Sequence, residues 1–168
     1  MLAKAANLYD DSMIARGASL DMSRHQVLTL ASMIEAEAAQ GGERAHISGV
    51  FHNRLRLGWP LQCDPTVVCA IGGLPPGRSL EKEDLAFDSP YNTYLHTGLP
   101  PGPICNPGMP SILAALHPDS TEDLYFVADG KGSHIFSRTL EAHNIARTRA
   151  KRNNHSPATR DQSHTDFR

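Results

Sequence analysis

Two glutamates on one predicted helix, Glu35 and Glu37, are the residues whose surroundings could give them catalytic chemistry. The helix buries one stripe of apolar side chains that recur at helical spacing, namely Val27, Ala31, Ile34 and Ala38. At about 100° per residue, Glu35 falls on the shoulder of that stripe and Glu37 falls nearer solvent. A carboxyl against apolar neighbours has a raised pKa, because burial disfavours its charged form. The spacing therefore predicts that Glu35 is a general acid.

A structural role for Glu35 stays open on the helix alone. In that role it is a helix-edge glutamate paired with a lysine or arginine, and such ion pairs also shift pKa values. The helix boundaries are clearer. Ser23 followed by Gln26 is typical of a capping box and predicts a start near Arg24, and the glycines at 41–42 are expected to stop the helix.

Residues 88–110 form a long stretch rich in proline and glycine, with no helix or strand pattern. Loops of this length tend to be functional, and prolines lower the entropy cost of holding one shape. Its side chains include hydrogen-bonding and stacking groups suited to a neutral sugar: Tyr91, Asn92, Tyr94, His96 and Asn106. A rigid structural wrap is the alternative interpretation of the same loop.

Composition excludes several classes of function. A length of 168 residues fits one domain, and a net charge of −2 argues against a general nucleic-acid binder. The Gly-Lys-Gly at 130–132 lacks the phosphate-loop pattern, and the nine histidines form no HExxH. We therefore expect no cofactor and no metal. A semi-buried glutamate beside a polar, aromatic loop suits carbohydrate chemistry.

The spacing of the three cysteines, Cys63, Cys69 and Cys105, gives no zinc framework. One disulfide with a remaining thiol is possible, and the pattern does not decide. The N-terminal run is too short for a signal peptide, and no stretch approaches the roughly 20 apolar residues of a membrane helix. We expect the chain as given to be soluble and to be a fragment of a longer protein.

The remaining patterns predict an α+β fold: several short helices around a long catalytic-type helix, one β-hairpin and a long ordered loop rich in Pro and Gly. We divide the chain into an N-terminal helix and connector (1–22), a catalytic domain (23–152) and a polar tail expected to be disordered (153–168). The predicted elements inside the domain are helices over 43–57, from 64, from 79, over 111–116 and over 139–152, and a hairpin over 124–137.

Seven ordered motifs together resemble one known family. They are Leu30-Ala-Ser-Met-Ile-Glu-Ala-Glu37, Val50-Phe-His-Asn-Arg-Leu55, Leu61-Gln-Cys-Asp-Pro-Thr-Val67, Ser89-Pro-Tyr-Asn-Thr-Tyr94, Gly98-Leu-Pro-Pro-Gly-Pro-Ile-Cys-Asn-Pro-Gly108, Tyr125-Phe-Val-Ala-Asp-Gly-Lys-Gly-Ser-His-Ile-Phe136 and Glu141-Ala-His143. From about Leu28 to His143 the chain resembles the catalytic domain of the endolytic murein transglycosylases, the MltG or YceG-like family. The resemblance implies cleavage of peptidoglycan between N-acetylmuramic acid and N-acetylglucosamine.

The catalytic glutamate of that family maps onto Glu35. The resemblance implies that it first protonates the glycosidic oxygen and then accepts a proton from the muramoyl C6 hydroxyl, which closes a 1,6-anhydro ring. Water is not consumed, so the enzyme is a lyase. One carboxylate serves both steps, which removes the need for the second carboxylate of ordinary glycosidases.

The expected substrate cleft holds side chains from several of these motifs: Gln62, Asp64, Tyr91, Asn92, Thr93 and Asn106, with Glu37 and His134 as weaker candidates. For Gln62 and Asp64, the alternative is a turn that buries its own polar atoms. For His134, a strand-facing core histidine is the favoured alternative to a ligand. For Arg54 we expect a structural ion pair.

The resemblance also implies partners and a location. The partners would be peptidoglycan glycan strands and peptidoglycan synthases, with no nucleic acid, and the location would be the cell envelope at the outer face of the cytoplasmic membrane. Family members usually carry a membrane anchor and a LysM-like region, which this chain lacks. Cys63 and Cys69 depart from the family pattern. A lysozyme-like hydrolase, with Asp64 or Glu37 as second carboxylate, and a non-catalytic glycan-binding module remain as alternatives.

Overall fold

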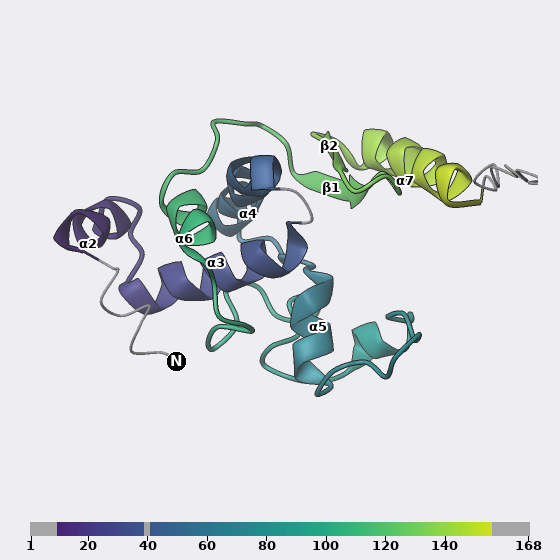
Figure 1. Cartoon of the computed structure of the whole chain (residues 1–168), viewed down its shortest axis with the longest axis horizontal. Coiled ribbons are helices and arrows are strands. Elements are labelled where there is room, and N and C mark those ends of the chain that lie inside the picture. Colours follow the sequence, from purple (N-terminus) through teal and green to yellow (C-terminus); the bar gives the residue numbers. More distant parts are fainter. Residues whose placement is uncertain (1–9, 39–40, 156–168) are drawn as a thin grey trace, which may run out of the picture.

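Helix α3 (Arg24–Glu37) lies at the centre of the fold, with the other elements arranged around it (Figure 1). The computed structural model describes residues 10–38 and 41–155. The predicted capping box is confirmed, because the Ser23 hydroxyl accepts from the Gln26 N–H and the Ser23 N–H donates to Gln26 Oε1 at 2.8 Å. The helix ends at Glu37, earlier than the expected stop at Gly41.

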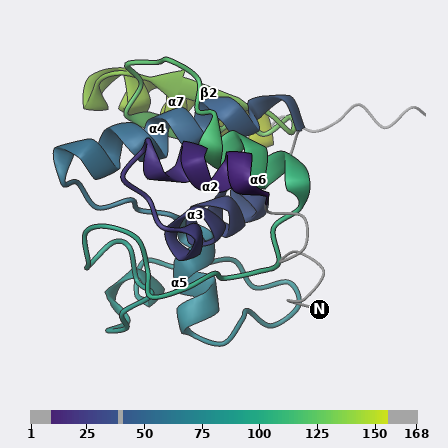
Figure 2. The same ribbon diagram turned by 90° about the vertical axis from the view of Figure 1, so that its left-hand side faces the viewer.

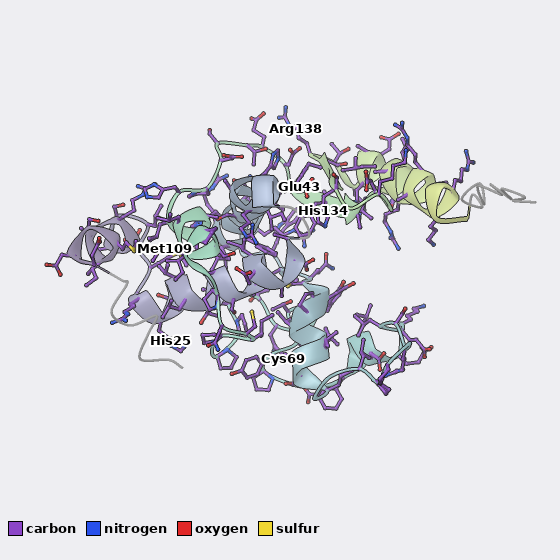
Figure 3. The ribbon with its side chains drawn as sticks, in the orientation of Figure 1. His25, Glu43, Cys69, Met109, His134 and Arg138 are labelled. Atoms are coloured by element: carbon purple, nitrogen blue, oxygen red, sulfur yellow. The ribbon has the colours of Figure 1, made fainter. Side chains whose placement is uncertain are left out.

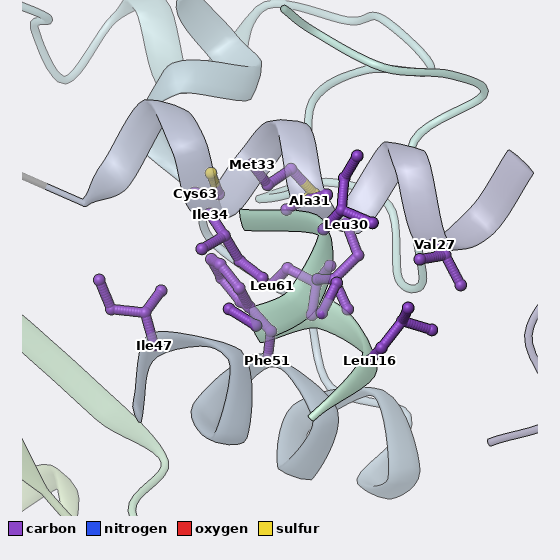
Figure 4. Close-up of a cluster of buried hydrophobic side chains, with 13 residues drawn as sticks. Val27, Leu30, Ala31, Met33, Ile34, Ile47, Phe51, Leu61, Cys63 and Leu116 are labelled. Atoms are coloured by element: carbon purple, nitrogen blue, oxygen red, sulfur yellow. The ribbon is translucent and has the colours of Figure 1, made fainter. Parts of the chain in front are cut away.

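The core is built where α3 packs on α4 (Arg44–Leu57) and α6 (Met109–Leu116). The large side chains between these helices are fully buried, as Figure 4 shows; among them are Val27, Leu30, Ile34, Ile47, Phe51 and Leu116. Burying one such side chain contributes about 1.5–3 kcal/mol. This packing fixes the C-terminal end of α3, which carries both glutamates, against the start of α6.

Two shorter helices extend this arrangement. Helix α2 (Asp11–Ala18) packs against α3 and α6, and α5 (Asp64–Ala70) packs against α3 (Figure 2). The predicted starts and stops hold here: Pro65 lies in the first turn of α5, and Gly58 ends α4 with a φ of 67°. A short 3₁₀ turn, η1 (Gly41–Glu43), leads into α4.

The predicted hairpin is confirmed as the strands β1 (Tyr125–Ala128) and β2 (His134–Ser137), which pair antiparallel with Phe126 opposite Phe136. Helix α7 (Leu140–His155) packs on both strands and extends away from α3 (Figure 1). Helices with one two-stranded antiparallel sheet make this the α+β fold that the sequence predicts.

Three further boundaries differ from the expectations. Helix α7 runs to His155, so its last turn includes residues that we assigned to the polar tail. The rest of that tail (156–168) and residues 1–9 of the N-terminal segment lie outside the described residues. Helix α6 begins at Met109, with Pro110 in its first turn. The helix expected from Ser79 is only the 3₁₀ turn η2 (Asp84–Ala86), because the Asp84 carboxylate accepts from the Glu81 N–H and from Arg78.

Within the described ranges, no helix combines the length and apolar character needed to cross a membrane. The division of the chain into segments 1–22, 23–152 and 153–168 remains a prediction.

Candidate active site

Glu35 lies at the C-terminal end of α3 and faces the start of α6. Its Oε2 accepts a 2.6 Å hydrogen bond from the Ser111 hydroxyl and a 3.2 Å hydrogen bond from the Gly108 N–H. Its Oε1 lies 3.7 Å from Nη2 of Arg44, at the start of α4. The side chain is 32% exposed, so a ligand can reach the carboxylate while three groups hold it in place.

The pKa of Glu35 is lowered from its ordinary value, which makes the expected rise wrong. The Ser111 hydrogen bond is the largest cause; the Gly108 N–H and the Arg44 charge also lower the pKa, while partial burial opposes them. Gly108 is the N-cap of α6, so the carboxylate also meets the positive end of that helix. The sequence left open an ion pair between Glu35 and a lysine or arginine, and the structure contains this pair with Arg44.

Ser111 and Arg44 form one network with Glu35. Arg44 Nε donates to Ser111 Oγ at 3.0 Å, and the hydroxyl of Ser111, which is fully buried, donates a hydrogen bond to Glu35. We did not identify either residue from the sequence. The usable signal was a helix start directly after a long proline-rich loop, because helix N-termini present free N–H groups that bind carboxylates.

Glu37 has the properties that we expected of Glu35. It is partly buried on a different side of α3, beside the Cys63 thiol and near the charges of Asp64 and His134. Burial raises its pKa to about 7, and the Asp64 charge adds to that rise. Our expectation that Glu37 lies nearer solvent was wrong, because Cys63 and Asp64, at the start of α5, lie against this side of the helix.

Asn92 and Thr93 are buried and hold the long loop in shape. Asn92 Nδ2 donates to the carbonyls of Leu85 and Phe87 at 3.0 and 2.8 Å, and Thr93 Oγ1 accepts from the Cys63 N–H at 3.0 Å. Their polar groups are therefore occupied within the protein. For these two residues the structure supports the structural-wrap interpretation, and the expected substrate contacts are withdrawn.

Gln62 and Asp64 reach the surface near the C-terminal end of α3. Gln62 takes a left-handed conformation (φ 52°), its N–H donates to the Thr93 carbonyl at 3.0 Å, and its Oε1 accepts from Arg54. Asp64 Oδ1 accepts a 2.5 Å hydrogen bond from the Tyr94 hydroxyl. Both side chains remain exposed, which leaves them available to a ligand.

Tyr91 and Asn106, although in the same loop, lie near opposite ends of α3. The Tyr91 hydroxyl is near Gly102 and His25, and His25 is about 15 Å along the helix from Glu35. Asn106 is exposed and lies two positions before Gly108, whose N–H contacts Glu35. Asn106 is therefore close in sequence to a residue that contacts Glu35, whereas Tyr91 lies at the far end of the helix from Glu35.

His134 belongs to the interior. Its Nδ1 lies 2.8 Å from Glu43 Oε2, its N–H donates to Glu43 Oε1, and its side chain is 8% exposed; Figure 3 shows the two side chains close together. This is the core histidine that we favoured over a ligand, so the substrate contact is withdrawn.

Arg54 is buried but makes no ion pair among the described residues, which corrects our expectation. It donates instead to backbone carbonyls of Leu124, Pro60 and Leu61 and lies over the Tyr125 ring at 5.2 Å. The carbonyl oxygens compensate its charge.

All three cysteines are free thiols: Cys63 is buried, and Cys69 and Cys105 are exposed. Across the parts of the chain that the structure describes, no three His, Cys, Asp or Glu side chains converge as metal ligands would. The Glu35 carboxylate is partly exposed, so it can exchange a proton with a ligand that lies against its exposed side.

Comparisons with known proteins identify the family of the chain. The model of the YceG-like family matches residues 1–149. The chain is 49% identical over 144 residues to an endolytic murein transglycosylase of Bacillus subtilis, covering 86% of this chain and 39% of the relative. It is 36% identical over 129 residues to a protein of the same name from Streptococcus pneumoniae, covering 74% of this chain and 23% of that one. The chain therefore spans well under half the length of these relatives.

The fold also has a solved counterpart. The crystal structure of a yceG-like protein from Listeria monocytogenes matches with a TM-score of 0.76 at 43% identity, covering 84% of this chain and 45% of that chain.

Proposed function

The chain belongs to the YceG-like family, and from this membership we propose that it is the catalytic portion of a lytic transglycosylase that cuts peptidoglycan glycan strands internally. The proposed substrate bond joins N-acetylmuramic acid to N-acetylglucosamine, and the product carries a 1,6-anhydro-muramoyl end. The observation that carries the proposal is Glu35, a ligand-accessible carboxylate held by Ser111, Gly108 and Arg44.

In the proposed reaction, Glu35 acts twice. Its protonated carboxyl donates to the glycosidic oxygen as the anomeric C1–O bond breaks, and the N-acetylglucosamine side leaves with a new hydroxyl. The resulting carboxylate then takes the proton of the muramoyl C6 hydroxyl as that oxygen bonds to C1. The two steps return Glu35 to its protonated form and consume no water.

The low pKa of Glu35 in the free protein must be offset when the sugar binds. A bound glycan covers the exposed side of the carboxyl and removes water, which raises the pKa. The C6 hydroxyl or glycosidic oxygen can also compete for the hydrogen bond that Ser111 now donates. Catalytic hydrogen bonds often rearrange on binding, so the geometry of the free site is compatible with this step.

Mass spectrometry of purified glycan strands tests the proposal. Incubation with the domain should give anhydro-muramoyl ends, and Glu35→Gln should abolish them. Glu122→Gln, an equal change on an exposed side chain outside the family motifs, is the matched control and should leave the product unchanged. Reducing ends would instead indicate the lysozyme-like hydrolase. Binding without any product from the folded domain would favour the glycan-binding module.

We further propose that the longer protein containing this chain works at the outer face of the cytoplasmic membrane beside peptidoglycan synthases. The support is the name of the relatives, which act on murein, a polymer of the cell envelope. Fractionation of cells that produce the full-length protein, together with crosslinking to synthases, tests both parts. Recovery of the full-length protein in the cytosolic fraction would contradict the location.

A further inference from the structure

A pocket of about 530 Å³ opens at the C-terminal end of α3, between this helix, α5 and the loop before α6. We call it the α5 pocket. Its walls include side chains from all three segments: Ala36, Asp64, Val68, Cys69, Ile104 and Cys105. Figure 3 labels Cys69 on α5, on the side of α3 opposite α4. Its size is within the range of pockets that bind small molecules.

The pocket adjoins the candidate active site at the C-terminal end of α3. Ala36 directly follows Glu35 in α3. Cys105 Sγ donates to the Ser32 carbonyl of the same helix at 3.2 Å, and the Glu35 charge contributes, after burial, to raising the pKa of the Cys105 thiol. A sugar whose bond lies at Glu35 can therefore place a substituent in the pocket.

The lining selects for a neutral group with methyl carbons. Val68, Ile104 and Ala36 are apolar, and the two thiols are weakly polar. Asp64 is the charged group in the lining, and its carboxylate already accepts from the Tyr94 hydroxyl. An anionic substituent would lie beside this carboxylate in a partly desolvated space, which like charges disfavour.

We propose that the α5 pocket binds the lactyl group of a muramoyl residue in its amide-linked form, so that the domain prefers strands that carry stem peptides over stripped strands. The inference rests on the proposed function. A lactyl group supplies one methyl carbon. With a peptide attached, its carboxyl is a neutral amide; after the peptide is removed, it is a carboxylate that faces Asp64.

The first test compares cleavage of matched glycan strands with and without stem peptides. Peptide-bearing strands should react faster by on the order of tenfold, the size of a screened repulsion between two partly exposed charges. Asp64→Asn keeps an acceptor for Tyr94 and should bring the ratio of the two rates close to one. Glu122→Gln, which removes an equal charge from an exposed side chain, should leave the ratio unchanged. Equal rates on both strands, or an unchanged ratio in Asp64→Asn, would overturn the proposal.

The second test does not depend on cleavage. Maleimide labelling of Cys69 and Cys105 in the Glu35→Gln variant is followed by peptide mass spectrometry. Bound peptide-bearing strands should slow the labelling rate on the order of tenfold, and stripped strands at equal concentration should slow it less. Cys63, which is buried, reports whether the fold stays closed. Protection without cleavage by the unmodified protein would count against the proposed function alone. Cleavage without protection would count against the α5 pocket alone.

Discussion

The Ser111 hydroxyl on α6 donates a 2.6 Å hydrogen bond to the Glu35 carboxylate on α3, across a separation of 76 positions in the sequence. Ser111 in turn accepts from Arg44 on α4, so three helices of the core meet at one carboxylate. The position of Glu35 therefore depends on the packing of α3, α4 and α6.

Ser111→Ala should destabilise the protein by about 1–3 kcal/mol at neutral pH, because it removes a hydrogen bond to a charged group. Glu35 has a lowered pKa in the folded state. Its contribution to stability is therefore present above its ordinary pKa and is lost as pH falls through the folded value. Urea unfolding at neutral and at acid pH checks this, and the difference between the two proteins should shrink in acid.

The same change should extend activity to higher pH. Removing the Ser111 donor raises the pKa of Glu35, so its protonated form persists further up the pH scale. The alkaline limb of the pH profile of kcat/KM on glycan strands should then move to higher pH. Ser48→Ala is the matched control, because Ser48 Oγ is buried and has no hydrogen-bond partner among the residues that the structure describes. A limb that stays in place in Ser111→Ala would contradict the role given to Ser111.

Glu37→Gln should stabilise the protein at alkaline pH and change little in acid. Burial raises the folded pKa of Glu37 to about 7 from 4.5. Between these two values the unfolded chain loses its proton first, so stability falls as pH rises, by up to about 3 kcal/mol. Glutamine cannot ionise and removes that loss. Urea unfolding at pH values below and above this window measures it.

Glu141→Gln, on an exposed position, should leave that pH dependence as it is. An equal pH dependence in Glu37→Gln and in the unchanged protein would show that Glu37 is not the group responsible.

Local signals in the sequence predicted the elements well, and contacts between distant segments limited the prediction of the site. The capping box at Ser23, the stop at Gly58 and the hairpin turn each depend on a few neighbouring residues. The environments of Glu35 and Glu37 depend on segments that are distant in the sequence. Ser111 of α6 donates to Glu35, and Cys63 and Asp64 lie against Glu37. A helical wheel places both on α3 but does not show what packs against each.

The same limit applies to the long loop. Its composition predicts hydrogen-bonding groups, and the structure separates them by burial. Asn92 and Thr93 bond to the protein itself, while Asn106 stays exposed two positions before Gly108. An asparagine that holds a loop and an asparagine that contacts a sugar have the same sequence signature, so only the three-dimensional structure distinguishes them.

Thr93→Val should destabilise the fold by about 1–3 kcal/mol, because valine has a similar shape and cannot accept from the buried Cys63 N–H. It also loses the 2.8 Å hydrogen bond with Thr66 Oγ1. Thermal unfolding followed by circular dichroism checks the loss. Thr97→Val, on an exposed side chain of the same loop, is the control and should stay within about 0.5 kcal/mol of the unchanged protein. A smaller effect for Thr93 than for Thr97 would contradict the structural role.

Gly49→Ala should destabilise the protein by about 1–3 kcal/mol or more through overpacking. A Cβ at this buried position on α4 would lie 2.7 Å from the Asp119 carbonyl oxygen and 2.8 Å from Thr121 Cγ2, so the segment that joins α6 to β1 would have to move. Gly42→Ala is the matched control, because its Cβ would meet no atom of the described ranges within 4 Å. Urea unfolding should separate the two variants clearly. Equal stabilities would mean that the segment after α6 yields without cost, which would contradict the close packing of Asp119 and Thr121 on α4.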